Sequence, residues 1–132
     1  MLPIPARSKF SLMLSVFSLA AFPLAAPADR IVDIAGSGYT SIQAAIDDAV
    51  PGETITVYPG RYVENINFLG KDLTLTSTDP DDPTVVAATI IDGSQPPDPL
   101  KASTVTFENA ESPAAVLTGV IFGNYKMIER GT

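Results

Sequence analysis

The chain has 132 residues, fifteen acidic and eight basic, with a formal net charge of −7 at pH 7. This length allows one domain at most, and the acidic balance excludes a general attraction to nucleic-acid phosphates. The absence of cysteine and histidine excludes disulfides, thiolate and imidazole metal ligands, and a Ser-His-Asp triad.

The N-terminal segment has the pattern of a secretory signal peptide. Two basic residues, Arg7 and Lys9, precede an apolar run over residues 10–22. Ala26-Pro27-Ala28 then fits the small-x-small cleavage pattern. The sequence therefore predicts export to a secreted, cell-surface or periplasmic location.

A retained membrane anchor is the alternative for this segment. Pro23 interrupts the run, which is short for a span of about 20 residues. We therefore expect residues 1–28 to be removed, so that the mature chain begins at Asp29 and has no membrane partner. It then holds six basic and fifteen acidic residues, a net charge of −9.

The mature chain is expected to begin with a short strand and one amphipathic helix. Residues 29–34 form the strand, a glycine turn follows, and the hydroxyl of Thr40 or Ser41 caps a helix at about 41–49. Pro51-Gly52 ends the helix. Its apolar face, at 3–4 spacing, is Ile42, Ala45, Ile46 and Ala49.

After the helix, the apolar period changes to two, which predicts short strands separated by turns. Ile55 and Val57 share one side of the first strand, and Ile66 and Phe68 point inward from the second. Two proline-rich segments, 78–83 and 94–99, are expected to be loops. The predicted strands are 54–58, 62–68, 73–76, 89–91, 103–107 and 114–122.

Short strands of this kind are typical of a sandwich, a barrel or a β-solenoid. Corresponding apolar positions recur at uneven intervals: Leu73-Leu75 follows Ile55-Val57 by 18 residues, and Val105-Phe107 follows Leu73-Leu75 by about 30. No hairpin signal joins neighbouring strands. The pattern favours a parallel solenoid whose variable loops bulge from the coils.

The motif order supports the same fold. The stretch YTSIQAAIDDAVPGETITVYPGRYVENINFLGKDLTLTS (39–77) resembles the N-terminal capping coil of right-handed parallel β-helix proteins of the pectin-lyase-like superfamily, with the layout of pectin methylesterases. The resemblance covers residues 31–122. It implies an all-β right-handed parallel β-helix of about three coils within 29–132, with the helix as a plug over its open end. Gln43 would orient this cap.

The resemblance implies no catalytic residue here, because the family's paired aspartates lie on later coils. From the residues themselves, Asp79, Asp81 and Asp82 are candidate Ca²⁺ ligands, with a solvated turn as the alternative. No other cofactor is expected.

Three residues are candidate sugar contacts. Tyr58 and Tyr62 have rings that would stack on a sugar, and Glu64 would accept bonds from its hydroxyls. The alternative is that these residues serve the strands and turns only. Arg61 is a weak candidate for a catalytic base.

The alternation stops before Tyr125–Thr132, which leaves the last coil open. We expect an amino-terminal fragment of a longer frame, or a complete module that self-associates end to end. The expected function is an exported, non-catalytic β-helix module associated with polysaccharide. The alternatives are a remnant of a pectinesterase-type or pectate-lyase-type enzyme, and an adhesive surface solenoid.

Overall fold

The computed structural model describes residues 2–3, 28–108 and 111–123. Apart from residues 2, 3 and 28, the predicted signal peptide lies outside the described residues, as does the segment Tyr125–Thr132. The elements are β1 (Arg30–Val32), α1 (Ile42–Asp48), β2 (Thr54–Val57), β3 (Gly60–Tyr62), β4 (Ile66–Asn67), β5 (Thr74–Ser77), α2 (Pro83–Ala88), β6 (Thr89–Asp92), the 3₁₀ helix η1 (Pro99–Lys101), β7 (Val105–Thr106), β8 (Val116–Thr118) and β9 (Ile121–Gly123).

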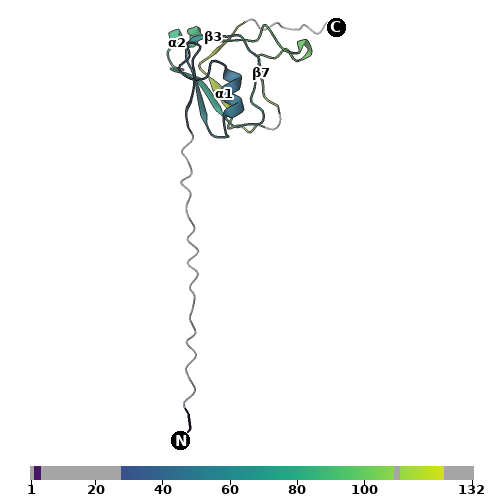
Figure 1. Cartoon of the computed structure of the whole chain (residues 1–132). Helices are drawn as coiled ribbons and strands as arrows, with labels where there is room; N and C mark the ends of the chain where they lie inside the picture. The colour runs from purple at the N-terminus through teal and green to yellow at the C-terminus, as the bar shows by residue number, and fades with distance from the viewer. Residues whose placement is uncertain (1, 4–27, 109–110, 124–132) are drawn as a thin grey trace.

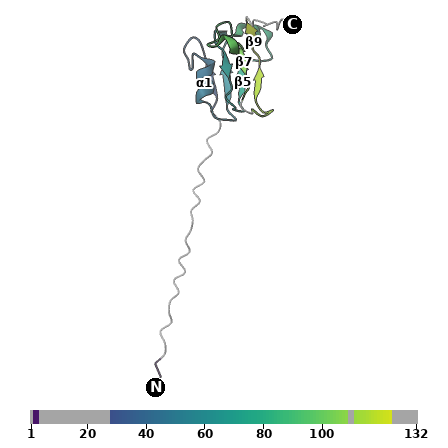
Figure 2. The same cartoon turned by 90° about the vertical axis from the view of Figure 1, so that its right-hand side faces the viewer.

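The described chain is mostly β-structure in parallel sheets with few helices. Its three sheets have the strand orders β1-β2-β5-β8, β3-β6-β9 and β4-β7, and every pairing is parallel. Successive strands therefore visit the three sheets in a fixed order: β2, β3 and β4, then β5, β6 and β7, then β8 and β9. Figure 2 shows α1 at one side of the row of strands and the yellow strand β8 at the other.

The strand register corrects two correspondences expected from the sequence. Ile55 pairs with Leu75, so β5 follows β2 by 20 residues rather than 18. Val105 pairs with Ile66 in the third sheet and does not continue the row of Leu73 and Leu75. The difference of two residues arises because alternate side chains of a strand lie on the same face. Leu73 and Leu75 are both fully buried, so the apolar pattern fits either of them opposite Ile55.

The predicted amphipathic helix is confirmed as α1, which packs against β1, β2 and β4 (Figure 1). Ser41 is its N-cap, with the side-chain oxygen accepting the N–H of Ala44 at 3.2 Å. The four predicted apolar positions are buried: Ile42, Ala45, Ile46 and Ala49. They join a core that also receives alternate side chains of the strands, among them Ile55, Val57, Ile66, Phe68, Leu75 and Ile91.

Two predicted strands are each divided in two. The expected strand 62–68 becomes β3, which already starts at Gly60, and β4, with a bend at 63–65 between them. The expected strand 114–122 becomes β8 and β9, separated at Gly119. Gly119 has a φ of 67°, a left-handed conformation that glycine adopts without the strain of a Cβ. These bends move the chain from one sheet to the next.

The helix α2 was not predicted, and it begins at Pro83, the last residue of the expected 78–83 loop. Asp82 caps it, with a carboxylate oxygen accepting the N–H of Thr84 at 2.8 Å, and Pro83 is its first residue. An aspartate followed by proline is a common helix start, so the signal was present. No helix within the described ranges combines the length and the apolar character that a membrane crossing requires.

Candidate functional site

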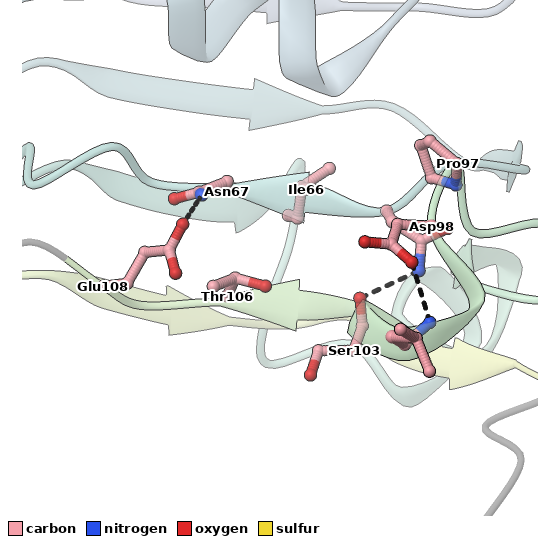
Figure 3. A pocket seen from close by; sticks show the side chains of 9 residues that line it. Ile66, Asn67, Pro97, Asp98, Ser103, Thr106 and Glu108 are labelled. Carbon is pink, nitrogen blue, oxygen red and sulfur yellow. Dashed lines mark hydrogen bonds between the residues drawn. The ribbon is translucent and has the colours of Figure 1, made fainter.

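A cavity of about 520 Å³ lies on the sheet formed by β4 and β7 (Figure 3). Beside it runs the proline-rich excursion, residues 93–104, which joins β6 to β7. The lining combines strand residues with residues of that excursion. The nine lining residues are Asn65, Ile66, Asn67, Pro97, Asp98, Leu100, Ser103, Thr106 and Glu108. Amide, hydroxyl and carboxylate groups therefore lie together at one surface hollow.

Parallel pairing of β4 with β7 forms the floor. Asn67 is the Cα partner of Thr106, and alternation turns both away from the core while Ile66 is buried. Glu108 lies two residues after the end of β7. Its Oε1 accepts a hydrogen bond from Nδ2 of Asn67 at 2.8 Å, as Figure 3 shows. This bond holds one carboxylate at the edge of the cavity.

Asn65 fastens the excursion to the sheet. Its Nδ2 donates to the carbonyl of Ser103 at 2.8 Å and to that of Gly93 at 3.3 Å. These two carbonyls lie at the two ends of the excursion, so the Asn65 side chain connects the two ends by hydrogen bonds. The Oδ1 atom of Asn65 is buried and has no hydrogen-bond partner among the described residues.

Asp98 shapes the wall of the cavity. It is the N-cap of η1, and its Oδ1 accepts the N–H of Leu100 at 2.9 Å. Pro99 starts the helix and restricts its backbone. The excursion thus has local structure of its own beside the sheet.

The predicted sugar contacts Tyr58 and Tyr62 are not among the lining residues. Tyr62 is only 2% exposed, and its hydroxyl donates to the carbonyl of Tyr58 at 2.9 Å. Burial raises the pKa of the Tyr62 phenol. Tyr58 is 39% exposed. The structure therefore places Tyr62 in the core and Tyr58 at the surface, with only the latter ring open to a ligand.

Glu64 lies at the start of α1. Its Oε1 accepts the N–H of Ile42 at 2.8 Å, while its Oε2 accepts the N–H of Gln43 and the hydroxyl of Ser41, both at 2.9 Å. A carboxylate suits this position because the first N–H groups of a helix have no partner within it. These contacts give Glu64 a structural task.

Two of the three aspartates of the 78–83 loop accept hydrogen bonds from the backbone. Oδ1 of Asp79 accepts the N–H of Asp81 at 3.1 Å and that of Asp82 at 3.2 Å, and Asp82 caps α2. No group of three or more acidic, histidine or cysteine side chains within the described ranges is arranged to hold a metal ion. The solvated-turn alternative fits this geometry.

Arg61 forms an ion pair with the buried carboxylate of Asp92. Hydrogen bonds from Ser94 and then Arg61 hold the pKa of Asp92 below its usual range. This ion pair joins β3 to β6. The guanidinium of Arg61, which the sequence suggested as a weak candidate for a catalytic base, is thus engaged with Asp92.

A second cavity, of about 490 Å³, is lined by residues of β7, of β9 and of the segment before β7. Its lining is Ala102, Ser103, Thr104, Val105 and Phe122. It has no charged lining residue, so the cavity on β4 and β7 offers the richer set of polar contacts.

Sequence reasoning did not single out the lining residues Asp98, Ser103, Thr106 and Glu108. The available signal was the polar, proline-rich segment 94–99 within this excursion, whose prolines and aspartate indicate an ordered loop. Its position over β4 depends on a pairing between distant segments.

The chain matches no family model, no curated protein and no solved structure.

Proposed function

We propose that the chain is an exported, non-catalytic saccharide-binding module whose parallel sheets form a right-handed β-helix of about three coils. The fixed order in which successive strands enter the three parallel sheets supports this fold. The cap helix and the motif order of residues 39–77, similar to pectin-lyase-like β-helix proteins, support it too. The signal-peptide pattern of residues 1–28 supports export.

The cavity on β4 and β7 is the observation that carries the binding function. Its volume of about 520 Å³ falls in the range of small-ligand sites. A saccharide unit presents several hydroxyl groups that both donate and accept hydrogen bonds. The hydroxyls of Ser103 and Thr106 and the carboxylates of Asp98 and Glu108 complement such a ligand.

Binding of the purified full-length chain to an array of soluble oligosaccharides tests this function. Thr106→Trp fills the cavity from the floor, and Thr118→Trp is the matched control on the exposed face of β8. We expect at least one saccharide class to bind, with a loss of roughly tenfold or more in Thr106→Trp and none in Thr118→Trp. Absence of any binding, or equal binding by Thr106→Trp, would overturn the proposal.

Two alternative functions predict different results in the same preparation. A remnant of a polysaccharide-active enzyme would cleave or de-esterify the bound saccharide. An adhesive solenoid would give oligomers whose size rises with protein concentration. The proposal expects bound saccharide to be recovered intact from a species of constant size.

A further inference from the structure

The cavity on β4 and β7 has more free acceptors than free donors. Nδ2 of Asn67 donates one of its two N–H groups to Glu108, and Nδ2 of Asn65 donates to two backbone carbonyls. Ser103 and Thr106 supply hydroxyls, which donate or accept as the ligand requires. The polar side chains that remain open to a ligand are therefore mainly acceptors.

The two carboxylates have unused acceptor capacity. Each has one oxygen in a hydrogen bond: Oδ1 of Asp98 with the N–H of Leu100, and Oε1 of Glu108 with Asn67. Among the side chains and backbone groups that the structure describes, none donates to Oδ2 of Asp98 or to Oε2 of Glu108. A bound ligand that donates strongly can occupy both oxygens.

The charge of the lining points the same way. Two of the nine lining residues are acidic and none is lysine or arginine. A uronate would bring its own carboxylate to these two, and like charges at close range repel. A protonated amine instead forms charge-assisted hydrogen bonds with either carboxylate.

We infer that the ligand of this cavity is a saccharide that carries free amino groups, such as a glucosamine oligomer, rather than a polyuronate. This inference rests on the saccharide-binding function proposed above. The ammonium group donates to Asp98 or Glu108, and the sugar hydroxyls bond to Ser103 and Thr106. The cavity thereby selects a cationic, donor-rich sugar.

Calorimetric titration of the full-length chain with three tetramers tests the inference. The probes are β-1,4-linked glucosamine, its N-acetylated counterpart, and galacturonate with and without Ca²⁺. We expect glucosamine to bind roughly tenfold more tightly than the N-acetylated tetramer, with a preference that weakens as salt is added. Galacturonate is expected to bind least.

The double variant Asp98→Asn with Glu108→Gln removes both charges and keeps the acceptor oxygens that cap η1 and bond Asn67. It should bind the glucosamine and N-acetylated tetramers with similar affinity, because the charge that distinguishes them no longer has a partner. An unchanged circular dichroism spectrum and melting curve would show that the variant is folded.

The outcomes separate this inference from the proposed function. Equal binding of the charged and N-acetylated tetramers, tighter binding of galacturonate, or an unchanged preference in the double variant overturns the amine preference alone. If no tetramer binds and the oligosaccharide array is also negative, the saccharide-binding function itself fails.

Discussion

The two carboxylate oxygens of Glu64 join the segment between β3 and β4 to the start of α1. They accept hydrogen bonds from Ser41, Ile42 and Gln43, more than 20 residues earlier. The sequence shows a glutamate beside an asparagine and gives no sign of these partners. From its chemistry alone, Glu64 was therefore predicted to contact a sugar, whereas in the structure it accepts hydrogen bonds from the first residues of the helix.

Glu64→Gln should lower the free energy of unfolding by about 1–3 kcal/mol, because donors at the start of α1 lose a charged acceptor. Urea denaturation followed by circular dichroism measures the change. The control is Glu108→Gln, an exposed residue whose replacement should cost about 0.5 kcal/mol or less. Equal stability of Glu64→Gln and the parent chain would contradict the capping role.

Glu53 should make stability depend on acidity. It is 5% exposed, and its carboxylate accepts a 2.6 Å hydrogen bond from Nε of Arg30, which lowers the pKa of Glu53. A lowered pKa adds stability above the unfolded value of about 4.3, and this stability is lost as pH falls through the folded value.

Glu53→Gln should therefore lose less stability than the parent chain when pH falls from about 5 to about 3. Thermal unfolding across this range measures the difference. Asp98→Asn is the control, since Asp98 is exposed. A parallel fall in Glu53→Gln and the parent chain would contradict the ion-pair account.

At the scale of elements, the sequence predicted α1 well because its signals are local. The 3–4 apolar spacing, the Ser41 cap and Pro51-Gly52 all act within one short segment. The strand 62–68 was predicted as one element because its alternation continues through the bend at 63–65. Hydrophobic period reports which side is buried and does not report where a strand changes sheet.

The side-chain amide of Gln43 hydrogen-bonds both backbone groups of Asn67, as the backbone of a neighbouring strand would. Its Oε1 accepts the N–H of Asn67 at 2.7 Å, and its Nε2 donates to the carbonyl of Asn67 at 3.2 Å. This satisfies the edge of β4 next to α1, where a free strand edge would be open to pairing. These two bonds join α1 to β4.

Gln43→Ala should lower the free energy of unfolding by about 1–2 kcal/mol and speed hydrogen exchange at the amide of Asn67. Amide exchange followed by NMR resolves that site. Asp47→Ala is the matched control, because Asp47 bonds the same Nε2 but leaves both bonds to Asn67 in place. Unchanged exchange at Asn67 in Gln43→Ala would refute the edge-capping role.

At the scale of the whole molecule, parallel β-structure could be predicted, but the register and the cavity could not. The two-residue offset of β5 leaves every side chain on the same face, so the apolar pattern fits both registers. The cavity requires Ile66 to pair with Val105 and the intervening excursion to fold over β4. Neither event leaves a local mark in the sequence.

Leu75 lies in the middle of the sheet, between Ile55 on one side and Leu117 on the other, and is fully buried. Leu75→Ala should lower the free energy of unfolding by about 2–5 kcal/mol through lost burial and a cavity between the strands. Leu100→Ala, at a residue 92% exposed, should change it by about 0.5 kcal/mol or less. Chemical denaturation of both variants measures the contrast, and similar costs would contradict the core assignment.

The most direct test of the account is an NMR titration of the isotope-labelled full-length chain with the oligosaccharide that binds it best. The account predicts that amide shifts change around the cavity, at residues 65–67, 98, 100 and 103–108. It predicts no change at α1 or at Tyr58, the exposed aromatic residue that the sequence also suggested. Shifts confined to Tyr58 and its neighbours, or none at saturating saccharide, would contradict it.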